Sequence, residues 1–97
     1  MAYKYSVGRR DFGDIEYEGD DNTHMFFVDA GTEKIGIKTN QPEIALDIND
    51  IAIRIRNDNT PSSASDFGMK GEIRWDTNYI YICVATDTWK RTAISSW

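Results

Sequence analysis

Residues 71–91, GEIRWDTNYIYICVATDTWKR, contain two of the three tryptophans of this 97-residue chain and its longest apolar run. At the start of the stretch, apolar Ile73 and Trp75 alternate with charged residues, which is the period of a half-buried β-strand. Residues 76–78 (DTN) favour a turn, because short Asx side chains bond their own backbone. The stretch therefore predicts a β-hairpin.

The second half of this stretch predicts two longer strands. Residues 79–84 (YIYICV) are apolar or aromatic at every position. Both faces of this strand therefore need cover, either from the chain itself or from another subunit. Residues 85–88 favour a second turn, and residues 89–94 complete a three-stranded meander. We expect an all-β fold that ends in this meander.

Two shorter strands are predicted upstream. Residues 25–28 and 34–38 flank a turn that contains Gly31, so they predict another hairpin. Gly36 lies between two isoleucines, and glycine weakens a strand unless another backbone must come close to it. We expect such a close approach, for which packing near a symmetry axis would be a reason.

Apolar residues then recur at every second position in two runs, 44–48 and 51–55, with one change of parity between them. A helix does not give this spacing. The pattern predicts two strands joined at Asn49-Asp50, because both residues tolerate left-handed backbone angles, or one strand with a bulge.

These elements divide the chain into four segments. Residues 1–24 are polar and predict an extended N-terminal arm, and residues 25–56 predict a β-hairpin module. Residues 57–70 (NDNTPSSASDFGMK) predict a linker, because so long a connection is unusual inside a compact domain. Residues 71–97 form the C-terminal meander. We therefore expect short antiparallel hairpins in two small modules, completed by trimerisation.

The composition limits the classes of function. The formal net charge is −5, and no clustered basic face is evident, so we expect no nucleic-acid partner. No apolar run approaches the roughly 18 residues of a membrane span, so we expect no membrane insertion. A chain of this length buries only about 60% of its unfolded surface, and oligomerisation is a common remedy for so small a core.

The residues that carry metal or nucleophile chemistry do not form a complete set. His24 follows Asp20, Asp21 and Asn22, but the spacing is not that of an EF-hand, and a solvated acidic turn is the better interpretation. Cys83 would need His24 as its base, yet it lies inside the apolar run, where a buried and inert thiol is expected. We expect no metal and no cofactor.

Paired carboxylates and tryptophans suggest carbohydrate chemistry as an alternative. Glu16 with Glu18 would be an acid pair of the kind that cleaves glycans, but so short a chain has little area for a long groove. Trp75, Trp89 and Trp97 would make a sugar-stacking platform, although their spacing favours core or interface positions. We expect no catalytic residue and no enzyme. A carbohydrate-binding module that recognises host-surface glycan is the alternative.

Two segments carry a resemblance to a known class of protein. Residues 71–91 resemble the C-terminal module of virion fibre and appendage proteins of tailed bacteriophages, especially those of marine cyanobacterial phages. Residues 26–48 (FFVDAGTEKIGIKTNQPEIALDI) are similar to a segment common in phage tail fibres. Lys38 stands where that pattern has glycine, so a backbone feature that needs glycine there is not assumed.

The resemblance implies a structural component of a virion, such as a short fibre, an appendage or a protein that decorates the capsid or tail. It also implies a homotrimer, assembly in the host cytoplasm, and attachment to other virion proteins through residues 1–24. Apolar and aromatic residues of both modules are expected at the subunit interface. They are Phe26, Phe27, Ile35, Ile37, Trp75, Tyr79, Ile80, Tyr81, Ile82 and Trp89.

Overall fold

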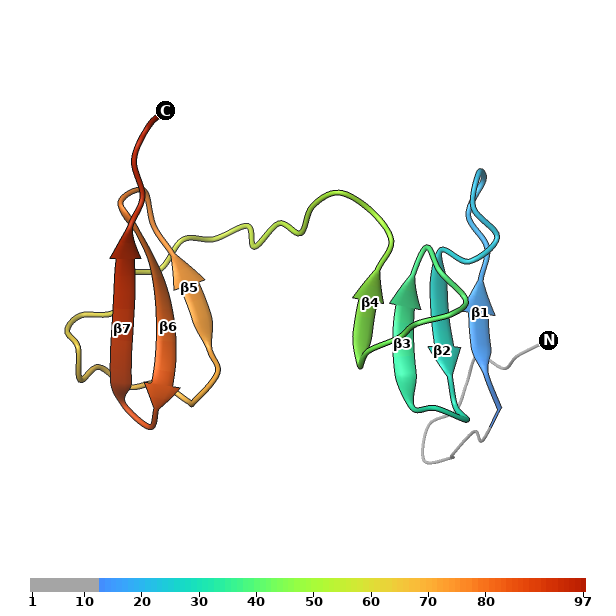
Figure 1. The fold of residues 1–97 in the computed structure, drawn as a ribbon, viewed down its shortest axis with the longest axis horizontal. Coiled ribbons are helices and arrows are strands. Elements are labelled where there is room, and N and C mark those ends of the chain that lie inside the picture. Colours follow the sequence, from blue (N-terminus) through green and yellow to red (C-terminus); the bar gives the residue numbers. More distant parts are fainter. Residues whose placement is uncertain (1–12) are drawn as a thin grey trace. The chain divides into compact units, whose positions relative to one another are not determined.

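The computed structural model describes residues 13–97, which form seven strands and no helix (Figure 1). The prediction of an all-β fold is confirmed. Contacts divide the chain into two compact units, Met1–Ala52 and Ile53–Trp97. The part of the predicted arm that covers residues 1–12 lies outside the described residues.

The first unit contains a four-stranded sheet in the order β1-β2-β3-β4. Its strands are β1 (Ile15–Tyr17), β2 (Phe26–Asp29), β3 (Lys34–Ile37) and β4 (Leu46–Ile48). β2 pairs antiparallel with β1 and with β3, which confirms the upstream hairpin. β4 pairs with β3 in parallel, so this part of the sheet is not a hairpin.

One face of this sheet is apolar across all four strands. Ile15, Val28, Ile35 and Leu46 form one cross-strand row, and Tyr17, Phe26, Ile37 and Ile48 form the next. Neighbouring residues of a strand point to opposite faces, so both rows share one face. None of these eight side chains is buried. We call this surface the eight-residue apolar face.

The expected close approach at Gly36 is present, but its cause lies within the chain. A Cβ atom added at Gly36 would lie 2.3 Å from the carbonyl oxygen of Thr39. The chain doubles back after β3 because Lys38 adopts a left-handed backbone with φ of 64°. Lys38, which stands where the resembling pattern has glycine, thus adopts a backbone conformation that favours glycine.

The strand expected over residues 51–55 is absent, and this prediction was wrong. β4 ends at Ile48, and the backbone N–H of Asn49 makes one more bond to β3, at the carbonyl oxygen of Ile37 (2.8 Å). Residues 51–55 leave the sheet and belong to no strand of either sheet. Alternation of side chains alone does not make a strand, because a strand also needs a hydrogen-bonded neighbour.

The second unit contains the predicted meander. Its strands are β5 (Ile73–Trp75), β6 (Tyr79–Ala85) and β7 (Thr88–Ala93), all antiparallel, in the order β5-β6-β7. The turn expected at residues 76–78 joins β5 to β6. A register shift between Cys83 and Ala85 precedes the turn into β7.

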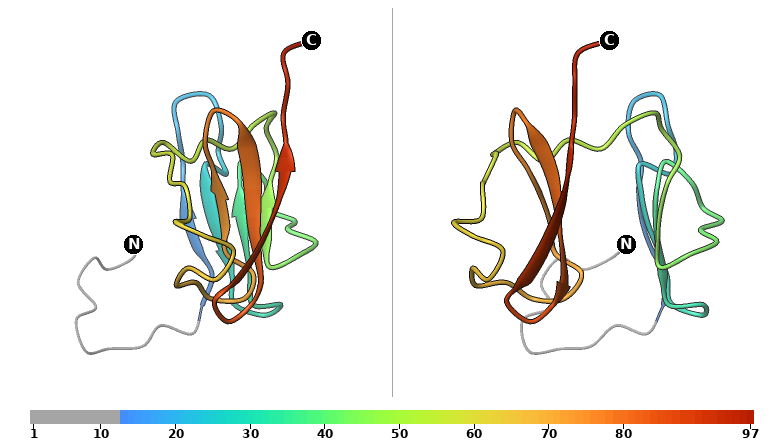
Figure 2. Two further views of the ribbon diagram at one scale, coloured as in Figure 1. Left: turned by 90° about the vertical axis from the view of Figure 1, so that its left-hand side faces the viewer. Right: turned by 60° about the vertical axis from the view of Figure 1, so that its left-hand side comes forward.

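The stretch that composition predicts to be a linker, residues 57–70, packs on this meander. Figure 2 shows it along one side of the sheet. The backbone N–H of Trp89 donates to the Ala64 carbonyl (2.8 Å), and its indole Nε1–H donates to the Asp66 carbonyl (3.1 Å). This segment therefore covers the sheet face that holds the buried core of Tyr81, Cys83 and Trp89. We call this the covered face.

The opposite face of the meander stays open. Cross-strand pairs place Ile73 beside Ile82 and Trp75 beside Ile80 on this face. Ile82 is 45% exposed and Ile80 39% exposed. Residues 57–70 thus cover one face of β6, whereas Ile80 and Ile82 on the other face stay exposed. We call this second face the open face.

Candidate functional site

The turn between β5 and β6 is organised by the carboxylate of Asp76. Its Oδ1 accepts the backbone N–H groups of Asn78 and Tyr79, both at 2.8 Å. Its Oδ2 accepts the hydroxyls of Thr60 (2.6 Å) and Tyr81 (2.5 Å). Four hydrogen bonds compensate for removing this charge from water, and Asp76 is only 9% exposed. Through Thr60 the same carboxylate fixes the covering segment to the sheet.

These bonds decide the protonation states at the turn. The hydroxyls of Thr60 and Tyr81 hold the pKa of Asp76 far below its usual range, with the Asn78 and Tyr79 N–H groups adding to the effect. The bond to Asp76, together with burial, raises the pKa of the Tyr81 phenol. Asp76 is therefore ionised and Tyr81 protonated at neutral pH. A carboxylate with this pKa does not serve as a general acid.

We predict that acid destabilises the chain, and that Asp76 contributes to this effect. Its folded pKa lies below its unfolded pKa, so its contribution is fully present above about pH 5 and is lost as the pH falls through the range of the folded pKa. The pKa values of Asp66 and Glu72 are also lowered, mainly by backbone N–H donors. Thermal melts between about pH 3 and pH 7 measure the effect.

The variant Asp76→Asn isolates the contribution of this carboxylate to the acid sensitivity. It should melt lower than wild type at neutral pH, because the amide cannot accept all four bonds with the same strength. It should also lose less stability between pH 6 and pH 3. A decline as steep as that of wild type would show that other carboxylates carry the acid sensitivity.

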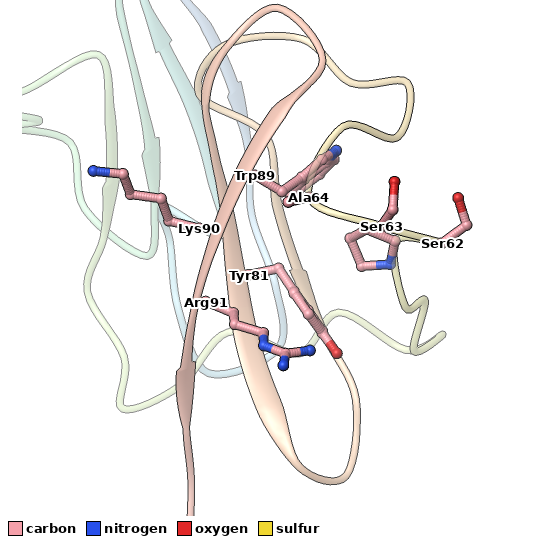
Figure 3. Close-up of a pocket in the computed structure, with 8 residues that line it drawn as sticks. Ser62, Ser63, Ala64, Tyr81, Trp89, Lys90 and Arg91 are labelled. Atoms are coloured by element: carbon pink, nitrogen blue, oxygen red, sulfur yellow. The ribbon is translucent and has the colours of Figure 1, made fainter.

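A groove of about 290 Å³ lies on the covered face of the meander. Residues 61–64 of the covering segment form one wall, and Tyr81, Trp89, Lys90 and Arg91 complete the lining. Figure 3 shows the side chains of Arg91 and Tyr81 extending in the same direction, while Lys90 points the opposite way. This agrees with the strand alternation, which places Arg91 on the covered face and Lys90 on the open face.

The ten predicted interface residues fall on several surfaces. Phe26, Ile35 and Ile37 belong to the eight-residue apolar face, whereas Phe27 pairs with Gly36 on the opposite face and is buried. Trp75, Ile80 and Ile82 lie on the open face of the second unit. Tyr79, Tyr81 and Trp89 lie on the covered face. The role of all ten in a subunit interface stays a prediction.

The three tryptophans do not form one platform in the structure. Trp89 is buried under the covering segment, and Trp75 donates from Nε1 to the carbonyl oxygen of Ile55 (2.8 Å). These two side chains lie on opposite faces of the sheet, and Trp97 follows the last strand as an exposed residue. The tryptophans therefore do not supply the stacking surface that the carbohydrate-binding alternative requires.

The other candidate groups have structural partners. The Nδ1 atom of His24 pairs with the Glu16 carboxylate, and its backbone N–H donates to Asn22 Oδ1 (2.8 Å). The thiol of Cys83 is buried, as predicted. Within residues 13–97 no three Cys, His, Asp or Glu side chains are grouped to hold a metal ion. No helix in this part of the chain is long and apolar enough to cross a membrane.

Two phage proteins match parts of this chain. One, from Klebsiella phage K64-1, is described as "Depolymerase, capsule K30/K69-specific" and is 38% identical over 56 residues, which cover 58% of this chain and 7% of that protein. The other, from Klebsiella phage K5-2, is described as "Depolymerase 1, capsule K30/K69-specific". It is 47% identical over 36 residues, which cover 37% of this chain and 4% of that protein. The chain thus spans less than a tenth of either relative.

No protein-family model and no solved structure matches the chain. The two partial matches support a bacteriophage protein of the tail-fibre type, as the resemblance implies. Both matched proteins come from Klebsiella phages, so they do not support the expected marine cyanobacterial-phage type.

Proposed function

We propose that this chain is a non-enzymatic structural segment of a phage virion fibre or appendage, and that it assembles as a homotrimer. The observation that carries the proposal is the eight-residue apolar face, none of whose side chains is buried. A contiguous apolar sheet face of this kind is normally packed against another layer. In our proposal, copies of the same chain supply that layer.

The second unit supports assembly independently. Its open face carries Ile80 and Ile82, which are too exposed to belong to a finished core. Three isoleucines that precede the meander in sequence are more exposed still, with Ile51 at 97%, Ile53 at 71% and Ile55 at 51%. These three isoleucines alternate along an extended segment without strand partners among the described residues. An acidic protein that left such rows in water would be prone to association.

The matched relatives are depolymerases, yet the matched segments are only 7% and 4% of their length. We propose that the shared segment is a structural module of those proteins and that this chain has no depolymerase activity itself. Among residues 13–97, the carboxylate with the most strongly lowered pKa is that of Asp76, and its oxygens already accept four hydrogen bonds. In the proposed virion, assembled in the host cytoplasm, residues 1–24 contact neighbouring virion proteins. A capsid-decorating position is the alternative location.

Light scattering on the chain at micromolar concentration tests the assembly. We expect three times the chain mass of 11.1 kDa. Ile82→Asp places a charge on the open face and should lower the measured mass, because burying an unpaired carboxylate between subunits is costly. Thr86→Asp adds the same charge at an exposed turn position and should leave the mass unchanged. A well-folded wild-type monomer would contradict the homotrimer.

The proposed lack of enzymatic activity has a separate test. Purified capsular polysaccharide of the K30 and K69 types, named for the matched relatives, is incubated with the chain, and reducing ends are measured. We expect no increase over buffer, while the depolymerase of Klebsiella phage K64-1 serves as the positive control. An increase that disappears when one acidic residue of the chain is substituted would show that it is an enzyme.

A further inference from the structure

The segment that covers the meander carries two exposed apolar side chains near its end. Phe67 is 76% exposed and Met69 70% exposed, although Gly68 between them is buried. Gly68 lies so close to the Trp89 indole that an added Cβ atom would be 2.6 Å from Cζ2 of the ring. The backbone at Gly68 therefore lies against the core, while the side chains before and after it stay in solvent. We call Phe67 and Met69 the loop tip.

Hydrogen bonds hold the backbone of the loop tip in place. The Gly68 N–H donates to Asp87 Oδ1, and the Asp87 N–H donates to the Gly68 carbonyl, both at 3.0 Å. The Met69 N–H donates to Glu72 Oε1 (2.8 Å), and the Glu72 N–H donates to the Met69 carbonyl (3.0 Å). A loop fixed in this way loses little conformational entropy on binding, so its apolar side chains are suited to anchor a contact.

The open face of the same unit holds an apolar groove of about 270 Å³. Its lining comes from β6 and β7 and consists of Ile80, Ile82, Val84, Lys90, Arg91 and Thr92. The guanidinium of Arg91 stacks on the Tyr79 ring of the covered face, whereas Lys90 pairs with Ile82 on the open face. The volume is below the roughly 300 to 1,000 Å³ of small-molecule sites, so the groove suits one inserted protein side chain.

We infer that the loop tip of one copy docks in this groove of a second copy, with Phe67 seated against Ile80 and Ile82. The inference rests on the proposed assembly and specifies what covers the open face. Charges of opposite sign meet at the rim, because Asp87 holds the loop tip and Lys90 borders the groove. Both side chains are exposed, and neither belongs to an ion pair within residues 13–97. Such complementarity fixes the orientation of a contact.

Residues 51–55 are a second exposed apolar segment, but they fit this groove less well. Arg54 lies among their isoleucines and would bring another cation beside Lys90. No strand pairing holds their backbone, so docking would cost them more conformational entropy. A contact from a loop of one copy to a groove of the next is heterologous, and three such contacts close a ring under threefold rotation. The contact is therefore compatible with the proposed homotrimer.

Paramagnetic relaxation in a mixed sample tests the contact. A nitroxide is attached to the Ser65→Cys variant, at an exposed position of the covering segment, since the native Cys83 thiol is buried. This chain without ¹⁵N is refolded together with ¹⁵N-labelled wild-type chain. We expect broadening of the amides of residues 80–84 and 90–92 in the ¹⁵N-labelled copy. Broadening confined to residues 51–55 or to the first unit would overturn the inference.

The same experiment separates this contact from the trimer. If light scattering shows a trimer and the amides of residues 80–84 stay sharp, the inference is wrong and the homotrimer stands. If the chain is a monomer at micromolar concentration but these amides broaden at millimolar concentration, the contact stands and the homotrimer is wrong.

Variants of the loop tip measure what the anchor contributes. Phe67→Ser should raise the dissociation constant of the assembly about tenfold or more, whereas Phe67→Leu should raise it much less, because leucine still fills the groove. Trp97→Ser removes another exposed aromatic side chain of this unit and should leave the dissociation constant unchanged. The amide spectrum of each variant reports its folding. A folded Phe67→Ser variant that assembles like wild type would overturn the contact.

A double-variant cycle tests the pair of charges at the rim. Asp87→Asn keeps an acceptor for the Gly68 N–H and removes the charge, and Lys90→Gln removes the opposite charge. Each should weaken assembly by up to about fivefold, as for an exposed ion pair. The double variant should be little weaker than either single variant, because both remove the same interaction. Losses that simply multiply in the double variant would show that Asp87 and Lys90 do not meet.

Discussion

Replacing Gly68 by alanine is expected to unfold the C-terminal unit at temperatures where the wild-type unit is folded. A Cβ atom at this position would lie 2.6 Å from Cζ2 of the Trp89 indole and 2.8 Å from Cε2 and Nε1. The ring has little freedom to retreat, because it is buried and its Nε1–H donates to the Asp66 carbonyl. The guanidinium of Arg74 lies 4.5 Å from its centre. We expect a loss of about 3 kcal/mol or more, at the upper end of overpacking costs.

Tryptophan fluorescence is a suitable measurement, because all three tryptophans belong to this unit. The melting temperature should fall by about 15 °C for such a loss. Ser65→Ala, at an exposed position of the same segment, should melt like wild type. In a Trp89→Leu background, Gly68→Ala should cost much less, since the clashing ring is gone. Additive losses in the double variant would show that the indole is not the cause.

The strands of the second unit were predictable because the signals that form them are local. Side-chain alternation at residues 73–75, the Asx turn at Asp76 and the apolar run of β6 lie next to one another in sequence. Each needs only its neighbours to take effect. The same is true of the hairpin of β2 and β3, whose turn is closed by a bond from the Glu33 N–H to the Asp29 carbonyl (2.7 Å).

The covering segment was not predictable in the same way. Its sequence has the composition of a linker, and what orders it is largely backbone bonding from carbonyl groups that any residue has. Examples are the bonds from Trp89 to the Ala64 carbonyl and from Asp87 to the Gly68 carbonyl. The parallel pairing of β4 was missed for a related reason, because a strand has the same alternation whichever direction its neighbour runs.

Part of the candidate site was predictable from the sequence, and part was not. Asp76 was identified as a turn residue, and the alternation of β6 places Tyr81 on one face with Cys83. Nothing in the sequence connects Thr60 to this carboxylate across 16 positions, although their bond holds the residue that precedes the groove wall of residues 61–64. Arg91 lies in the last predicted strand, where its charge alone does not mark it as a residue of the groove. Strand alternation would have placed Arg91 and Lys90 on opposite faces of the meander, because neighbouring residues of a strand point to opposite faces.

Replacing Gly36 by alanine is expected to disrupt the first unit at least as strongly. The added Cβ atom would lie 2.3 Å from a backbone atom, the Thr39 carbonyl oxygen, which a side-chain rotation cannot move away. Gly36 is also in an inner strand, paired with Phe27 on one side and Asp47 on the other. The turn after β3 would have to open, and the hydrogen bonds that anchor this turn would be lost. These include the 3.2 Å bond from the Lys38 N–H to the Met25 carbonyl.

The expected loss is about 3 kcal/mol or more, a large share of the stability of so small a unit. Gly31→Ala is the matched control in the same unit, because its nearest contact would be an ordinary 3.5 Å from Asp29 Oδ1. Far-UV circular dichroism and amide signals of residues 13–52 should report the loss in Gly36→Ala and not in Gly31→Ala. If Gly36→Ala melted like wild type, the Thr39 carbonyl would have to lie elsewhere. The left-handed backbone at Lys38 would then not be what turns the chain after β3.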